Sequence, residues 1–202
     1  MNRPVKTLLT LGSGSPRRAE LLCQLGLDFD VLRPDIDETP HEGERAGDYV
    51  ARMSRSKSTA IRPAVSPDRL VLCADTTVTL DDRILGKPDS AAECEDMLMR
   101  LSGRRHSVLT ALSLGTAAET HSQVVETIVA FRRLTREECH DYWLTGEPVD
   151  KAGGYGIQGL GATLVESIAG SYSNVVGLPL METATVLRKF GIDCLKRQRR
   201  PS

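Results

Sequence analysis

The chain has 202 residues, of which 40% are hydrophobic and 26% are charged, and its formal net charge is −1. This composition is typical of a globular protein with a core of its own, and it excludes the disordered and fibrous classes. The near-neutral charge also excludes a polycation that binds nucleic acid over its whole surface. Within this balance the cations are 20 Arg and only 6 Lys, so each lysine is a candidate for a specific role.

The ends of the chain and its cysteines indicate a cytoplasmic protein. The sequence predicts no secretory signal, and no apolar run of about 18 residues predicts a membrane span. The five cysteines are scattered, which favours buried, reduced thiols over disulfides or a zinc site. Residues 1–195 are interpreted as a single domain and the basic cluster at 196–202 as a flexible tail, since one short cluster is only weak evidence for nucleic-acid binding.

The predicted elements interleave strands and helices in chain order. Strands are expected at residues 7–11, 29–32, 70–80, 83–85, 106–114, 123–134 and 162–168. Helices are expected at residues 16–25, 46–61, 90–101, 135–145 and 179–190. Asp81-Asp82 predicts a tight hairpin turn, so antiparallel pairs intrude among the strand–helix units. The sequence therefore predicts an α/β fold with a mixed sheet.

A glycine- and serine-rich loop leads from the first strand into the first helix. Ser15 is the expected N-cap, and Pro16 suits the first helical position. Arg17 and Arg18 in the first turn have the wrong sign for the helix dipole, whereas a bound phosphate would make both favourable. The alternatives are therefore a phosphate-binding loop, which we favour, and an ordinary exposed helix start.

Asp75 interrupts an apolar, strand-like run, so it is either a hydrogen-bonded structural carboxylate or one that binds metal or accepts a proton. A two-residue turn at Asp81-Asp82 would place Lys87 opposite Thr76, which delivers a cation next to Asp75. Lys57 lies on the same helical stripe as Val50, Met53, Ala60 and Ile61. Its side chain either extends along the rim of the core or points into a cleft as a phosphate ligand.

Two loops complete the set of candidate residues. Glu38 ends an acidic stretch that is either a polar loop or, together with Asp75, a site for Mg²⁺ with phosphate oxygens as the other ligands. Residues 153–161 hold five glycines, and Lys151 and Gln158 flank them or lie among them. Gln158 has the paired donor and acceptor that can recognise the edge of a base. The alternative is that this segment is only a turn-rich connection.

Taken together, the cations, carboxylates and glycine loops favour phosphate-ester chemistry assisted by a divalent ion. No Ser/His/Asp or Cys/His arrangement stands out, and no Walker phosphate-binding string occurs.

Several strings together resemble the Maf family of nucleoside triphosphate pyrophosphatases, once described as septum-formation inhibitors. The strings are residues 12–18 with Glu20-Leu21-Leu22, Ala74-Asp75-Thr76, Gly86-Lys87-Pro88, Ser102-Gly103 with His106, and residues 151–159 with Val176-Gly177-Leu178-Pro179. They run in order over nearly the whole chain. This sequence has Gly12 and Gly154 where the family more often has alanine, two small-for-small changes.

The resemblance implies an elongated α/β fold of the inosine-triphosphatase-like type, with two lobes around a cleft. It implies hydrolysis of dTTP or UTP to the monophosphate and pyrophosphate, dependent on a divalent cation. We expect this cation to be Mg²⁺ or Mn²⁺ held by Glu38 and Asp75. One oxygen of Asp75 cannot both bind metal and accept a proton, so which role dominates stays open. Carried across, Asp75 is the proton acceptor, and Arg17, Thr76 and Gln158 are specificity positions. The remaining polar cleft positions are Ser13, Arg18, Glu38, Lys57 and Lys87, of which Glu38, Lys57 and Lys87 are also assigned to catalysis.

Two other interpretations stay open at this point. The substrate is either an ordinary pyrimidine nucleotide or a modified one, in which case the enzyme would clean the nucleotide pool. The rival from another class is a non-catalytic regulator of cell division that binds a protein or DNA partner. The resemblance also suggests a homodimer.

Overall fold

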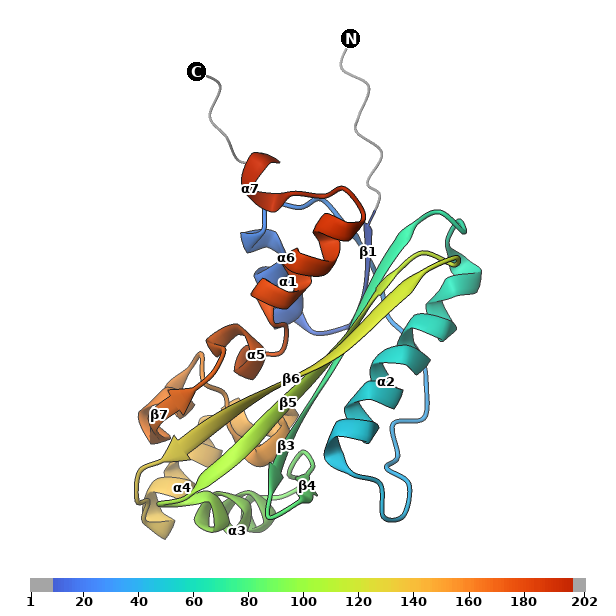
Figure 1. Cartoon of the computed structure of the whole chain (residues 1–202). Helices are drawn as coiled ribbons and strands as arrows, with labels where there is room; N and C mark the ends of the chain where they lie inside the picture. Colours follow the sequence, from blue (N-terminus) through green and yellow to red (C-terminus); the bar gives the residue numbers. More distant parts are fainter. Residues whose placement is uncertain (1–8, 198–202) are drawn as a thin grey trace.

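The structure, a computed structural model, describes residues 9–197. Its strands form a seven-stranded mixed sheet in the order β2-β1-β3-β5-β6-β7, with β4 paired to β3 (Figure 1). The parallel part is β2 (Asp30–Leu32), β1 (Leu9–Gly12) and β3 (Leu70–Leu80). The antiparallel part adds β4 (Arg83–Leu85), β5 (Arg105–Gly115), β6 (Thr120–Phe131) and β7 (Val165–Ala169). The predicted α/β fold with a mixed sheet is confirmed.

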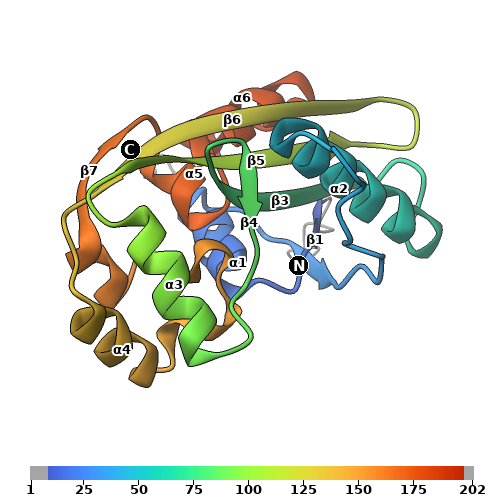
Figure 2. The same ribbon diagram turned by 90° about the horizontal axis from the view of Figure 1, so that it is seen from below.

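Helices cover both faces of this sheet. Helix α2 (Ala46–Ile61) packs on β3 and β5 from one side, whereas α1 (Pro16–Gln24) and α6 (Leu180–Lys189) lie on the other (Figure 1). Seen from below, α3 (Ala91–Leu101) and α4 (Arg136–Leu144) gather at one end of the long strands (Figure 2). The short helices are α5 (Tyr172–Val176), α7 (Cys194–Arg197), η1 (Arg62–Ala64), η2 (Glu147–Asp150), η3 (Ala152–Gly154) and η4 (Leu160–Leu164).

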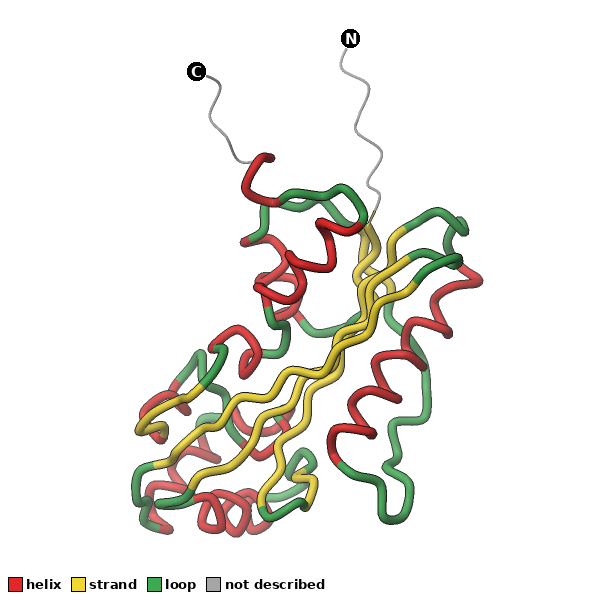
Figure 3. Tube along the Cα trace, viewed as in Figure 1, coloured by secondary structure: helices red, strands yellow, loops and turns green. Residues whose placement is uncertain are grey.

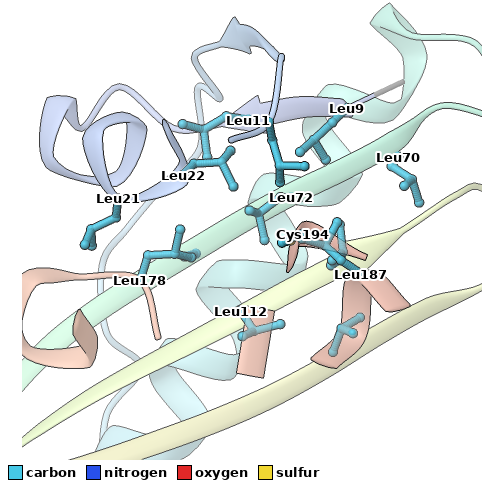
Figure 4. Packing of buried hydrophobic residues seen from close by; sticks show 14 of the residues in the cluster. Leu9, Leu11, Leu21, Leu22, Leu70, Leu72, Leu112, Leu178, Leu187 and Cys194 are labelled. Carbon is cyan, nitrogen blue, oxygen red and sulfur yellow. The ribbon is translucent and has the colours of Figure 1, made fainter. Parts of the chain in front are cut away.

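Two hydrophobic cores share the long strands, which run through both parts of the molecule (Figure 3). The first core packs leucines of β1, β3 and β5 against α1 and α6 (Figure 4). The second packs Val78 and Leu80 of β3 against α3, α4 and the end of β6. Thr76 lies between the two sets on β3, and its partner across the ladder is Thr110 of β5. The polar pair Thr76–Thr110 therefore separates the two cores on this face of the sheet, and each core defines one lobe of the molecule.

Alternation along β3 sends neighbouring residues to opposite faces of the sheet. Val71 and Cys73 pack with Ile61 of α2, so Asp75, the next residue in this series, also faces α2. Leu72 and Ala74 belong to the core under α1, so Thr76 faces the side of α1. One strand thus supplies adjacent polar groups to two different helices.

Gly12, where the resemblance leads us to expect alanine, is explained by close packing between β1, β3 and α2. A Cβ atom at this position would lie 2.2 Å from the Cys73 Sγ atom and 2.6 Å from the Ile61 Cδ1 atom. A side chain here would require the Cys73 and Ile61 side chains, which fill the space between β3 and α2, to move. Gly12 therefore keeps the helix that carries Lys57 close to β3.

Some local predictions are wrong in detail. Residues 162–164 belong to the 3₁₀ helix η4 rather than to a strand, so β7 begins only at Val165. Ser15 occupies the N-cap of α1, but its side chain makes no capping hydrogen bond. Ala60 is exposed, and the buried stripe of α2 includes Ser54 and Ser58 instead.

Other outcomes concern the cysteines and the end of the chain. Cys23 is exposed, whereas the other four cysteines are buried as predicted, and none of the five forms a disulfide. Helix α7 includes the first two residues of the basic cluster at 196–202, and residues 198–202 lie outside the described part of the chain. Within residues 9–197, no helix is long and apolar enough to cross a membrane.

His106 belongs to the second lobe and is only 3% exposed. Its Nε2 atom lies 2.8 Å from the Tyr155 hydroxyl, and its ring meets Phe131 edge-on. Burial lowers its pKa to about 4 because the imidazolium would lose its hydration. The unfolded chain binds a proton below about pH 6.5, whereas the folded protein does so only near pH 4, so this residue lowers stability as the pH falls through that interval.

We expect the free energy of unfolding to fall between pH 7 and pH 5 by roughly 2 kcal/mol more in the wild type than in His106→Gln. Urea unfolding at both pH values measures this difference. The comparison between variants removes the contribution of carboxylates that titrate in both proteins. Equal losses in the two proteins would contradict the assignment of a neutral, buried His106.

Candidate functional site

A cavity of about 700 Å³ opens where the two lobes meet. Its lining comes from the loop after β1 and the start of α1, the segment after β2, α2, β3, the segment after β4, and residues 150–159. All nine predicted site residues line it: Ser13, Arg17, Arg18, Glu38, Lys57, Asp75, Thr76, Lys87 and Gln158. The structure therefore brings together every residue that the sequence singled out for the site.

Lys57 and Asp75 form a buried ion pair at this cavity. The Lys57 Nζ atom donates a hydrogen bond of 2.6 Å to the Asp75 Oδ1 atom, and each side chain is less than 10% exposed. The same ammonium lies 2.7 Å from the Glu38 Oε1 atom, and the Glu38 side chain is 51% exposed. Lys57 therefore points into the cleft rather than along the rim of the core, and it holds two carboxylates near each other.

The pKa values of the two carboxylates move in opposite directions. Burial raises the pKa of Asp75, and the charges of Lys57 and Arg18 offset only part of this effect. Burial also raises the pKa of Glu38, but the hydrogen bond and charge of Lys57 outweigh it, so the net pKa is lowered. Two carboxylates on one ammonium thus differ because one is enclosed and the other faces solvent.

The Arg18 side chain extends from α1 to Thr76 of β3, on the face of the sheet opposite α2. Its guanidinium donates to the Gly177 carbonyl at 2.8 Å, to the Ser13 Oγ atom at 3.2 Å and to the Thr76 Oγ1 atom at 3.0 Å. Burial lowers its pKa, although the charge of Asp75 opposes this. Because guanidinium has five N–H groups, two remain for a ligand. Arg18 is therefore a fixed cation on the floor of the cavity.

The threonine pair behind Arg18 is anchored in turn. The hydroxyls of Thr76 and Thr110 are 2.9 Å apart, and Thr110 donates to the Asn174 carbonyl at 3.0 Å. The Asn174 amide donates to the Val108 carbonyl and to the Thr127 hydroxyl, both at 3.0 Å. This network joins β3, β5, β6 and α5, so the position of Thr76 depends on all four elements.

Asp150 links two cations at the mouth of the cavity. Its Oδ2 atom lies 3.2 Å from Arg17 Nη1, and its Oδ1 atom lies 2.7 Å from Lys151 Nζ. Lys151 also donates to the Glu147 carbonyl at 2.6 Å. The Arg17–Asp150 pair ties the helix of the first lobe to the loop that carries Gln158.

Glu147 fixes the glycine-rich loop around Gln158. Its Oε1 atom accepts from the Tyr142 hydroxyl at 2.6 Å and from the Gly161 N–H at 3.0 Å, and its Oε2 atom accepts from the Leu160 N–H at 2.8 Å. A Cβ atom at Gly159 would lie 2.2 Å from Oε2. The glycine is therefore required because the carboxylate approaches the backbone closely.

Lys87 lies at the cavity, but the hairpin does not bring it to Asp75 as predicted. The predicted register is confirmed for three pairs, from Leu80–Arg83 to Val78–Leu85, and the ladder ends there. Lys87 is exposed and makes no hydrogen bond or ion pair with the described residues. It acts on Glu38 only through its charge, which helps to lower the pKa of that carboxyl. Lys57 supplies the cation next to Asp75 instead.

Sequence reasoning missed several groups of the site, namely Arg33, Tyr49, Thr110, Glu147, Asp150 and Asn174. Glu147 and Asp150 had one available signal, because they flank a glycine-rich segment in which a carboxylate can meet free backbone N–H groups. Thr110 and Asn174 had none, since their partners lie far away in sequence. Arg33 and Tyr49 belong to no motif that the sequence offered.

Glu38 and Asp75 suit a divalent ion only when a bound substrate supplies further oxygen ligands. Among the described residues, no group of three or more His, Cys, Asp or Glu side chains could hold a metal ion. Asp75 and Glu38 converge on Lys57, and the second oxygen of each makes no hydrogen bond within the described chain. Mg²⁺ typically takes one or two protein carboxylates and completes its shell with water and substrate phosphates. The two free oxygens match that requirement.

Comparison with known proteins decides the family. Residues 8–190 match the model of the family described as Maf-like protein. The chain belongs to this family. A dTTP/UTP pyrophosphatase of Vibrio parahaemolyticus serotype O3:K6 is 53% identical over 182 residues, which cover 90% of this chain and 96% of that protein. The protein of the same name in Ruegeria sp. is 50% identical over 187 residues, covering 92% and 96%.

A solved structure, that of the Staphylococcus aureus Ham1 protein, aligns with 61% of this Maf-like chain and 70% of its own. The sequence identity is 18% and the TM-score is 0.42. The assignment to the family rests on the sequence matches.

We expect Glu147→Ala to lower the free energy of unfolding by about 2–3 kcal/mol, because the Tyr142 hydroxyl and two backbone N–H groups lose their acceptor. Urea unfolding measures this change, with Glu42→Ala at an exposed loop position as the matched control, expected within about 0.5 kcal/mol of the wild type. Equal effects of the two substitutions would show that Glu147 does not hold the loop.

Proposed function

We propose that this protein hydrolyses a nucleoside triphosphate, with dTTP and UTP favoured, to the monophosphate and pyrophosphate. The observation that carries the proposal is the buried Lys57–Asp75 pair at a cavity lined by six cations. Relatives about 50% identical over most of the chain are named dTTP/UTP pyrophosphatase, which supports the same substrate class here. Modified pyrimidine nucleotides fit the same chemistry.

In this proposal Asp75 accepts a proton from the attacking water. Its Oδ1 atom is held by Lys57 at 2.6 Å, which leaves Oδ2 for the water. The water oxygen bonds to the α-phosphorus, and the bond from that phosphorus to the bridging oxygen breaks. The electron pair goes to the departing pyrophosphate, and the proton goes to Asp75.

Other side chains orient and stabilise the phosphates. Arg18 lines the cavity with two N–H groups that donate to no described residue, and Lys87 lines it without an ion pair within residues 9–197, so both suit the charge of the phosphate oxygens. Gln158 and Arg17 lie on the loop and helix that Asp150 ties together, which suits recognition of the nucleoside end. These roles follow from chemistry and position.

Glu38 and Asp75 would hold Mg²⁺ or Mn²⁺ through their free oxygens, with substrate phosphates as the remaining ligands. The Asp75 Oδ2 atom is also the one assigned to the water, so it serves either as a metal ligand or as the proton acceptor at any one time, whereas Glu38 is free to be a ligand throughout. Such an ion supplies charge that offsets the negative charge of the phosphates. Location in the cytoplasm and a homodimer stay predictions.

We expect Asp75→Asn to reduce turnover of dTTP at least ~100-fold, because asparagine still accepts a hydrogen bond from Lys57 but cannot take a proton. Pyrophosphate release from a panel of nucleotides measures this, with Asp68→Asn at an exposed position as the control. Unchanged turnover in Asp75→Asn would rule out the proposed base. No release from any nucleotide by the wild type would rule out the activity and favour a binding protein.

Dialysis against a chelator should abolish release of pyrophosphate, and Mg²⁺ or Mn²⁺ should restore it. We expect Glu38→Gln to raise the Mg²⁺ concentration for half-maximal activity several-fold, since one ligand charge is lost. Glu42→Gln, which changes a nearby exposed carboxylate, should leave that concentration unchanged. If the Mg²⁺ dependence of Glu38→Gln matches the wild type, Glu38 is not a ligand.

A further inference from the structure

Arg33 is a cation of the cavity that lies outside the set of predicted site residues. Four other cavity cations already have protein acceptors, namely Arg17, Arg18, Lys57 and Lys151. Arg33 is exposed, and no hydrogen bond or ion pair joins it to any residue within 9–197. A guanidinium that borders a cavity without an acceptor is free to bind an anionic ligand.

The register of the parallel strands places Arg33 next to the phosphate-binding loop. Leu32 of β2 is the partner of Gly12 of β1, so the next residues along, Arg33 and Ser13, leave the sheet side by side. Gly12 is also the partner of Cys73 on β3, two residues before Asp75. The strands β1 and β2 end at the cavity, whereas β3 continues past it and presents Asp75 beyond the end of β1. Ligands commonly bind where parallel strands end.

Local contacts direct the Arg33 side chain toward the loop. A Cβ atom at Gly14 would lie 3.5 Å from the Arg33 Cδ atom and 3.6 Å from its Cγ and Nε atoms, so the stem lies over Gly14 at ordinary contact distance. Pro34 follows and favours extended backbone at Arg33. The guanidinium is thereby held near the loop that contains Ser13.

The order of the strands indicates which part of a triphosphate Arg33 meets. Arg33 follows β2, Asp75 is on β3, and β1 lies between them, so the two backbones are separated by roughly 10 Å. The loop with Gln158 lies farther along β3 than Asp75, because β4 pairs with Val78–Leu80 and the Gly153 N–H donates to the Gly86 carbonyl after β4 at 2.9 Å. A substrate with its nucleoside near Gln158 and its α-phosphorus at Asp75 extends its remaining phosphates toward β2.

We propose that Arg33 binds the terminal diphosphate of the substrate and, after cleavage, the inorganic pyrophosphate product. The inference rests on the proposed function, because it takes Asp75 as the position of the α-phosphorus. Arginine suits this task since its planar fork contacts two phosphate oxygens at once. The monophosphate product keeps only the α-phosphate at Asp75, so we expect its binding not to depend on this side chain.

The test compares product inhibition in Arg33→Ala and in Arg55→Ala, which removes an exposed arginine from α2 outside the cavity lining. We expect Arg33→Ala to raise the inhibition constant of inorganic pyrophosphate and the KM for dTTP about tenfold, in keeping with the loss of one charge-assisted contact. Inhibition by dTMP should stay unchanged, and Arg55→Ala should change none of the three constants. Arg33→Lys, which keeps the charge without the fork, should lie between the wild type and Arg33→Ala.

Two results would overturn the proposal. One is an unchanged pyrophosphate inhibition constant in Arg33→Ala, and the other is equal weakening of pyrophosphate and dTMP, which would indicate a general effect of charge. Calorimetric titration of pyrophosphate into the unmodified protein and Arg33→Ala gives the same comparison without turnover. If no nucleotide is hydrolysed but pyrophosphate binding still depends on Arg33, the proposed reaction fails and the anion subsite stands.

Discussion

The arrangement of the site depends on one ammonium group enclosed between two carboxylates. Lys57 comes from α2, Asp75 from β3 and Glu38 from the segment between β2 and α2. An unpaired Lys57 or Asp75 at this depth would be strongly destabilising, so the pair fixes α2 against the sheet. Gly12 permits this approach because Cys73 and Ile61 fill the space in which its side chain would lie.

The cavity lies where the long strands extend beyond the first hydrophobic core and into the second. On the face of β3 opposite α2, Ala74 ends the first core and Val78 begins the second, and Thr76 lies between them. The hydroxyl of Thr76 is satisfied by Arg18 and Thr110, so the gap between the cores is polar without unsatisfied groups on this pair. Since the neighbouring Asp75 faces α2, two successive residues connect both sides of the sheet to one ligand site.

The sequence was sufficient to predict the sheet type, the long strands and nine of the residues that meet at the cavity. Strand alternation and helical spacing are local properties, and they correctly placed Lys57 on the buried side of α2 and Asp75 within β3. The local sequence did not determine which cation lies next to Asp75. A hairpin register pointed to Lys87, whereas the packing of α2 on β3 delivered Lys57.

The remaining misses have the same physical origin. Arg17 and Asp150 are 133 residues apart, and only the folded sheet brings them together. Ser15 stands at the start of α1 as predicted, but its side chain does not cap the helix, and its backbone N–H donates to Ser13 at 3.2 Å. These hydrogen bonds and ion pairs depend on the side-chain geometry of the folded chain, so composition and spacing do not predict them.

The most direct test of the central interaction is a double-mutant cycle on the free energy of unfolding for Lys57→Met and Asp75→Asn. The account predicts that Lys57→Met alone costs about 3 kcal/mol, because it leaves a buried carboxylate without its cation. Adding Asp75→Asn to that variant should recover at least about 1 kcal/mol of the loss, since no buried charge then remains. Strictly additive effects of the two substitutions would contradict the pairing on which the site depends.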